Sequence, residues 1–337
     1  MAPTGALSYR WIFDTGGSGR GAWSGGFGYR LAKDLGEAGI GPAVLTGSSI
    51  GAFTSMDLAT GDPEVLYRSW SNWSDTIPVD VPIDPAERGF FGLFSFRRSV
   101  KQSIAFTLDP PTEAALFDPR NSRRLFIVTS RVVPETAPRR GDLMRMFLMV
   151  ATREWRHKYR PRGLRFEPVV YGRWPEDPEP AAAAAGCPWL RRLTPANVRE
   201  ALMASCLLPL VMGQPVPLDG DRLIDGGITS KTPLAFAHHS GGDALDRLVR
   251  TDRTLVVLNN PEGIMWKTAL RLDAWNDSEW VRHETAAGNL LVAHPVRRIR
   301  NSTVTRDPAA TMRTFDQGQE EARLFLRRDP ARRFFEL

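Results

Sequence analysis

The sequence contains little cysteine and no long apolar run. Only two of its 337 residues, Cys187 and Cys206, are cysteines, and they occur without Cys-x-x-Cys or Cys/His spacing. This scarcity argues against a disulfide framework and a zinc site, so we expect two buried free thiols in a reducing compartment. No stretch approaches the length that spans a bilayer, and residues 1–6 lack the basic and apolar segments of a signal peptide. We therefore expect a cytoplasmic protein without a signal peptide or transmembrane segment.

Charge of one sign is in modest excess. The chain has 44 Lys and Arg against 38 Asp and Glu, which gives a formal net charge of +6 and a pI near 9.7. The arginines are scattered and not interleaved with aromatic residues, so we expect no nucleic-acid partner. The excess does suit an anionic membrane surface, with which we expect possible peripheral contact. With 42% hydrophobic residues, the chain can bury a full core as one large domain or one domain with an appendage.

The most informative stretch is residues 44–52, an apolar run that ends in Gly-x-Ser-x-Gly and continues into residues 53–59. This order predicts a strand, a tight turn and a helix. A serine at the centre of such a turn sits on a strained backbone with its hydroxyl above the sheet edge. Ser49 is therefore the candidate nucleophile, although the motif alone is a weak signal.

A second strand, turn and helix precede it. Residues 9–13 predict a strand, residues 14–22 a glycine-rich turn, and residues 23–38 a helix. Such a turn presents backbone N–H groups to an anion. The segment also fits the G-x-G-x-x-G/A dinucleotide fingerprint, but the next strand ends in the Ser49 turn where that fold needs an acidic residue. We favour an oxyanion hole beside Ser49.

A serine hydrolase also needs a base. None of the five histidines has a telling context: His157, His238, His239, His283 and His294. An α/β-hydrolase triad of Ser49, Asp225 and a later histidine fits the chain order, but in that fold several strands precede the nucleophile, and here only one does. Residues 215–224 predict a hairpin that turns at Asp219 and Gly220, which leaves Asp225 at the end of its second strand. Alone, the Asp-Gly-Gly segment reads equally well as a second turn.

Taken together, these motifs resemble the patatin-like phospholipase family over about residues 11–237. The glycine-rich loop, the Gly-x-Ser-x-Gly-Ala turn, the Ala-Ser-x-x-x-Pro helix end at residues 204–209 and Asp-Gly-Gly follow one another in the family's order. The resemblance implies that Ser49 is the nucleophile and Asp225 the base of a dyad without histidine. It assigns the oxyanion hole and the supporting motif positions as follows: Gly16, Gly17, Ser18 and Gly19 for the hole; Arg20, Gly21, Gly47, Gly51, Gly226 and Gly227 for support.

One position departs from the family pattern. The family loop usually reads Gly-Gly-Gly-x-Arg/Lys-Gly, and here Ser18 replaces the third glycine. If that position requires a positive φ, a serine there would be strained and could pull one amide out of line.

The remaining segments complete the expected fold. We expect strands at residues 125–129, 166–171 and 254–258, and helices at residues 278–292 and 317–327. The aromatic residues of the stretch 62–107 either form a flap over the active site or pack on the core: Trp70, Trp73, Phe90, Phe91, Phe94 and Phe96. These elements predict an α/β protein with a mainly parallel central sheet flanked by helices, three-layered as in patatins. A hydrolase domain would span residues 9–240, and residues 241–337 would add one further strand and helices.

The expected function is hydrolysis of a lipid carboxylic ester by a Ser-Asp dyad, without metal or organic cofactor. A catalytically silent lipid- or protein-binding relative is the alternative, which the Ser18 departure supports. A Ser-His-Asp esterase is the third possibility. The sequence distinguishes neither acyl length nor headgroup.

Overall fold

The computed structural model describes residues 7–73, 97–134, 164–175, 187, 189–208, 213–234, 248–269, 271, 273–301 and 307–337. Within these ranges the strands form one sheet in the order β5-β4-β3-β2-β1-β8-β9, with the hairpin β6-β7 joined to β3. The strand bounds are β1 Tyr9–Phe13, β2 Pro42–Ser48, β3 Arg124–Pro134, β4 Leu164–Arg173, β5 Leu190–Arg192, β6 Val216–Leu218, β7 Asp221–Asp225, β8 Arg253–Val257 and β9 Leu290–Ala293.

The centre of the sheet is parallel. β1 pairs in parallel with β2 and β8, and the pairs β2-β3 and β8-β9 are also parallel, whereas β3 is antiparallel to β4 and β7. Every residue of β1 is buried. Strands covered on both faces need a continuous apolar run, and that explains why β1 contains Trp11, Ile12 and Phe13 in succession.

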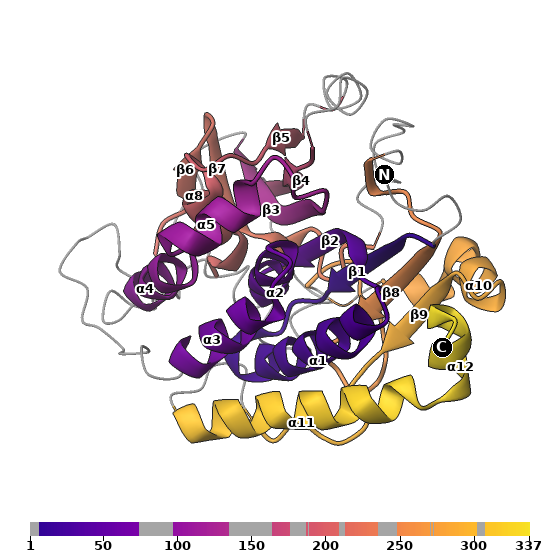
Figure 1. Cartoon of the computed structure of the whole chain (residues 1–337). Coiled ribbons are helices and arrows are strands. Elements are labelled where there is room, and N and C mark those ends of the chain that lie inside the picture. The colour runs from indigo at the N-terminus through magenta and orange to yellow at the C-terminus, as the bar shows by residue number, and fades with distance from the viewer. Residues whose placement is uncertain are drawn as a thin grey trace.

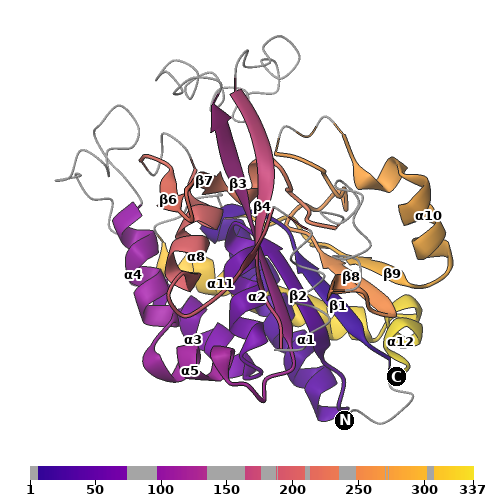
Figure 2. The ribbon, with the colours of Figure 1, turned by 90° about the horizontal axis from the view of Figure 1, so that it is seen from above.

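Helices flank this sheet (Figures 1 and 2). The helix bounds are α1 Gly17–Glu37, α2 Ile50–Ala59, α3 Pro63–Trp73, α4 Arg97–Thr107, α5 Pro110–Phe117, α8 Val198–Cys206, α10 Glu279–Ala286, α11 Pro308–Leu326 and α12 Asp329–Phe335, with short 3-10 turns η4 Gly226–Ile228 and η5 Trp275–Asp277. In the part of the chain that these elements cover, no helix has the length and apolar character needed to cross a membrane. The expected mainly parallel α/β fold with flanking helices is confirmed.

The long helices α1 and α11 lie against each other below the strands in Figure 1. A Cβ atom on Gly26 would lie 1.9 Å from the Phe315 carbonyl oxygen, and one on Gly318 would lie 2.1 Å from the Trp23 carbonyl oxygen. The two backbones are therefore in contact, and any side chain at these glycines would separate them. Trp23 and Phe27 stack at this crossing, with ring centroids 4.9 Å apart.

Two predicted boundaries are wrong. The first helix begins at Gly17, six residues earlier than expected, so most of the predicted glycine-rich turn is helical. Residues 278–292 do not form one helix, because α10 ends at Ala286 and the apolar residues that follow form β9. Gly288, with a φ of 77°, makes the turn between them.

The other expected elements are present, with longer bounds in several cases. β3, β4, β8 and the β6-β7 hairpin cover the predicted strands, and α11 covers nearly all of residues 317–327. Both cysteines are buried free thiols, as expected. In the aromatic stretch, Trp70 is buried in the core, and Phe90, Phe91, Phe94 and Phe96 lie outside the described residues.

Candidate active site

Ser49 occupies the sharp turn between β2 and α2. Its φ of 56° and ψ of −130° lie in a region that costs a non-glycine residue about 1–3 kcal/mol. The flanking glycines make this turn possible. A Cβ on Gly47 would lie 2.1 Å from the Gly51 carbonyl oxygen, and one on Gly51 would lie 2.3 Å from the Phe13 carbonyl oxygen. The predicted strand, turn and helix around Ser49 are therefore present, with the serine at the strained position.

The glycine-rich turn lies beside Ser49. The register of the parallel pair places Phe13 opposite Gly47, so the chain leaves β1 and β2 at the same level of the sheet. At this edge a Cβ on Gly21 of α1 would lie 2.5 Å from the side chain of Ile50, the residue after Ser49. The N-terminal part of α1 therefore packs directly on the nucleophile turn. Gly19 and Arg20, in the first turn of this helix, are buried and half-buried respectively.

The N-terminus of α1 carries the N–H groups that the sequence assigned to an oxyanion hole. Gly16 is the N-cap residue, and no side chain caps this end of the helix. The first N–H groups of a helix have no partner within it, so here they remain available to an anionic oxygen. The positive φ of this turn, 65°, belongs to Gly17, and Ser18 has no positive φ. The strain considered for Ser18 is therefore absent.

Asp225 reaches this edge from the other side of β2. β3 pairs with β2 through Ser48 and Val128, and with β7 through Thr129 and Asp225. The carboxylate is 4% exposed, beside a Ser49 that is 9% exposed. Its Oδ1 accepts a 2.7 Å hydrogen bond from the Gly227 N–H. Its Oδ2 has no hydrogen-bond partner among the described residues.

Burial raises the pKa of Asp225 from 3.8 to about 6, against the lowering effects of the Ser49 hydroxyl, the Gly227 N–H and the Lys231 charge. Glycine is required at the two positions after it for space. A Cβ on Gly226 would lie 2.0 Å from the Val128 carbonyl oxygen, and one on Gly227 would lie 2.7 Å from the Thr15 side chain. Asp225 is therefore a buried carboxylate whose pKa of about 6 lies nearer to neutral pH than the ordinary value. Its Oδ2 makes no hydrogen bond with any described residue.

Ser205 was given no role in the sequence analysis, yet it holds the nucleophile turn. Its Oγ accepts a 3.0 Å hydrogen bond from the Ser49 N–H and donates a 2.7 Å hydrogen bond to the Val128 carbonyl. Ser205 thereby fixes the backbone of Ser49 relative to β3. The Ala-Ser-x-x-x-Pro segment was the available signal for this residue.

A buried ion pair supports the glycine-rich turn. Lys231 Nζ lies 2.8 Å from Oδ2 of Asp14, which is fully buried and directly precedes the turn. Burial raises the pKa of Asp14 even though Lys231 lowers it. Oδ1 of Asp14 accepts hydrogen bonds from the Thr15 N–H and, at 3.3 Å, from the Thr232 hydroxyl. No sequence signal pointed to this pair, because its members are 217 residues apart.

The histidines do not assemble a triad among the described residues. His283 is exposed and pairs with Glu284, whereas His294 contacts Gly263 and interacts with the Pro295 carbonyl. His157, His238 and His239 lie outside the described residues. Within those residues no group of three or more His, Cys, Asp or Glu side chains is arranged to hold a metal ion.

A parallel sheet with a strained serine at one edge, a helix N-terminus beside it and a buried carboxylate across from it is an arrangement typical of serine acyl hydrolases. The family model of patatin-like phospholipase matches residues 12–238, two thirds of the chain. The chain therefore belongs to the patatin-like phospholipase family, and this membership supports lipid acyl hydrolysis as its general function. A comparison with curated proteins gives no match.

Proposed function

We propose that the protein hydrolyses carboxylic esters of lipids with Ser49 as nucleophile and Asp225 as base. One observation carries this proposal. A strained serine and the unpaired Oδ2 of a buried carboxylate share one sheet edge, and the Ser49 hydroxyl is the strongest of the interactions that lower the Asp225 pKa.

In the proposed mechanism, Ser49 Oγ attacks the acyl carbonyl carbon while its proton passes to Oδ2 of Asp225. The carbonyl oxygen becomes an oxyanion, which the N–H groups of Gly16, Gly17, Ser18 and Gly19 stabilise. The bond to the leaving alcohol then breaks, and Asp225 returns the proton to that alcohol. Water attacks the acyl-enzyme with Asp225 again as base and releases the carboxylic acid.

The raised pKa of Asp225 matters for this role. A carboxylate with the ordinary pKa of 3.8 is a weak base toward a serine hydroxyl, and a pKa of about 6 brings its basicity closer to working pH. The base nevertheless stays ionised at neutral pH. Burial thus supports proton transfer by Asp225 without a histidine.

The proposed catalytic unit is about residues 9–240, with residues 241–337 packed on it. The substrate is a lipid or other acyl ester, and the excess of basic residues supports peripheral contact with an anionic membrane from the cytoplasm. The catalytically silent alternative depended on strain at Ser18, and Gly17 carries the only positive φ of the turn. That alternative therefore loses its supporting observation.

The test is covalent labelling by a fluorophosphonate probe, with the adduct mapped by mass spectrometry. Labelling is expected at Ser49, and Ser49→Ala should abolish both labelling and hydrolysis of a soluble ester. Ser55→Ala is the matched control, because its buried hydroxyl lies on α2 and makes no hydrogen bond within the described residues. Labelling that persists in Ser49→Ala would refute the assignment.

The base is tested in the same assay. Asp225→Asn should lower the rate by several orders of magnitude, as loss of the base does in comparable acyl-transfer sites. Alanine variants of His238, His239, His283 and His294 should retain activity. A collapse in any one of these would favour a Ser-His-Asp esterase.

A further inference from the structure

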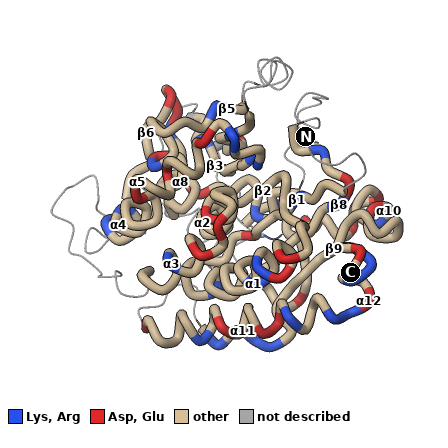
Figure 3. Tube along the Cα trace, viewed as in Figure 1, with Lys and Arg blue, Asp and Glu red and all other residues tan. Residues whose placement is uncertain are grey.

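A hollow lies away from Ser49, between α11 and the segment that follows β9. It has a volume of about 880 Å³, and its charged lining is mainly arginine: Arg297, Arg298, Arg300 and Arg313, with Asp316 and Glu320. Figure 3 shows α11 with both basic and acidic residues along it. We call it the arginine hollow.

Two of the four arginines have uncompensated charge. Arg297 is paired with Glu320 and Glu321, and Arg313 with Asp307. Arg298 and Arg300 are exposed and make no ion pair with any described residue. An arginine guanidinium with free donors in a concave site binds phosphate groups well, because its planar fork matches two phosphate oxygens.

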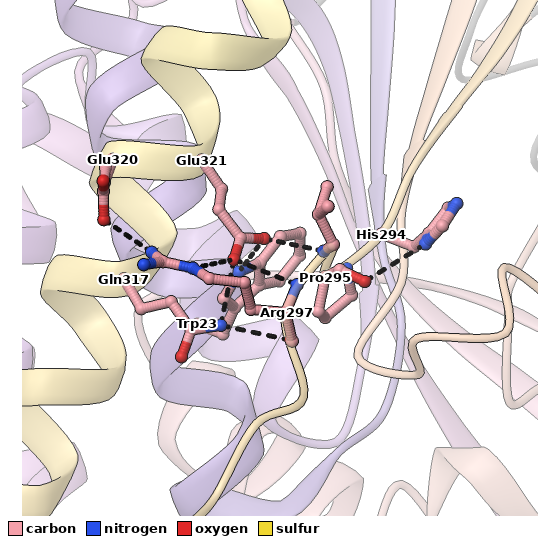
Figure 4. A network of polar contacts seen from close by, with 8 residues as sticks. Trp23, His294, Pro295, Arg297, Gln317, Glu320 and Glu321 are labelled. Atoms are coloured by element: carbon pink, nitrogen blue, oxygen red, sulfur yellow. Dashed lines mark hydrogen bonds and ion pairs between the residues drawn. The ribbon is translucent and has the colours of Figure 1, made fainter.

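The backbone that carries these arginines is fixed in place. Glu321 of α11, whose side chain is 3% exposed, accepts hydrogen bonds from the Val296 N–H at 2.8 Å and from Arg297 Nε at 3.1 Å. It also accepts from Trp23 Nε1 of α1 at 3.1 Å (Figure 4). Burial raises the Glu321 pKa, but the hydrogen bonds from Val296, Gln317 and Arg297 outweigh it and lower the pKa overall. The chain that leads into Arg298 and Arg300 is therefore held against α11.

The segment that carries these arginines leaves the sheet at its catalytic edge. Ala293 pairs with Val257, and Val257 pairs with Phe13, which pairs with Gly47. β9 therefore ends at the level of the Ser49 turn, three strand spacings away, or about 15 Å. Arg298 and Arg300 therefore follow closely after a strand end that lies at the level of the nucleophile.

We propose that Arg298 and Arg300 bind the phosphate groups of anionic phospholipids and so dock the protein on the membrane that contains its substrate. This inference rests on the proposed function for its substrate class, but the binding itself does not require catalysis. The ligand is the lipid headgroup at a bilayer surface, because two exposed arginines without ion pairs among the described residues and a net charge of +6 complement an anionic membrane.

The test is co-sedimentation of the full chain with two kinds of vesicle, pure phosphatidylcholine and equal parts phosphatidylcholine and phosphatidylglycerol. Binding is expected only to the second. The double variant Arg298→Gln and Arg300→Gln should bind it roughly thirtyfold more weakly, which corresponds to about 1 kcal/mol for each arginine. Thermal melting confirms that the variant is folded.

The matched control removes the same charge elsewhere. Arg323→Gln with Arg327→Gln alters two exposed arginines at the other end of α11 and should bind vesicles nearly as the unaltered protein does. Equal losses in both double variants would attribute binding to net charge and overturn the site. Binding of soluble glycerol phosphate in the hollow without vesicle binding would overturn the lipid assignment.

Ser49→Ala separates this inference from the proposed function. Vesicle binding should persist in that variant. Binding that depends on Arg298 and Arg300 in a chain that hydrolyses no ester would refute the proposed function and leave the docking site standing. Ester hydrolysis without any vesicle binding would refute the docking site alone.

Discussion

Asp225→Asn should inactivate the enzyme and, at neutral pH, stabilise the fold. The Asp225 carboxyl has a folded-state pKa of about 6 against an ordinary value of 3.8, because burial penalises its charge. Between these two values the folded protein binds a proton that the unfolded chain does not. The free energy of unfolding must therefore fall as the pH rises through this window.

The size of the effect follows from the pKa difference. One pKa unit corresponds to about 1.4 kcal/mol. The rise of the Asp225 pKa from 3.8 to about 6 therefore lowers the free energy of unfolding by up to about 3 kcal/mol above pH 6. Asparagine does not titrate, and its amide oxygen can accept the hydrogen bond that Asp225 accepts from Gly227. The variant should match the unaltered protein near pH 4 and exceed its stability by up to about 3 kcal/mol near pH 7.

Urea unfolding at a series of pH values measures this difference directly. Asp316→Asn, which alters an exposed carboxylate on α11, is the matched control. The free energy of unfolding of this variant should follow that of the unaltered protein over the same pH range. A difference between Asp225→Asn and the unaltered protein that does not grow with pH would refute the reasoning. The same pKa predicts that ester hydrolysis by the unaltered enzyme declines below about pH 6, where the base becomes protonated.

Three further substitutions test the supporting structure. Ser18→Gly should leave the rate about unchanged, since Ser18 has no positive φ, and a large loss in steady-state assays would assign its hydroxyl a role. Ser205→Ala should lower kcat more than it changes KM and cost about 1–3 kcal/mol in urea unfolding, because it removes the acceptor of the Ser49 N–H and a donor to the Val128 carbonyl. Lys231→Met should move the acidic limb of the pH profile to higher pH, because Lys231 lowers the Asp225 pKa, and an unmoved limb would contradict this.

The sequence predicted those parts of the fold that short-range patterns determine. β1 and β2 contain the short apolar runs Trp11–Phe13 and Val44–Leu45, and the Gly-x-Ser-x-Gly turn and the Asp219-Gly220 hairpin are local backbone requirements. In the hairpin both turn residues have positive φ, 49° and 81°, as that type of turn needs. Such features involve only neighbours in the chain, so one sequence contains them completely.

Tertiary contacts decided the features that were missed. Glycine has low helix propensity, which argued for a turn up to residue 22, but α1 needs a small residue at Gly21, where it packs on the nucleophile turn. A Cβ on Gly21 would lie 2.5 Å from the side chain of Ile50, which belongs to another element of the fold. The Asp14–Lys231 ion pair likewise has no spacing that a sequence reveals, although it lies next to the proposed oxyanion hole.

The segment beyond residue 240 is also part of the site's support. β8 pairs with β1 along its whole length, and the Asp14 N–H donates to the carbonyl of Val257 at the end of β8. Asn259, two residues later, donates a 3.0 Å hydrogen bond to the Asp14 carbonyl, and its side chain would lie 2.7 Å from a Cβ on Gly16. The N-cap of α1 is thus held between β1 and residues from the C-terminal segment. If this N-terminus stabilises the oxyanion, then residues 241–337 contribute to catalysis through the position of Gly16, without touching the substrate.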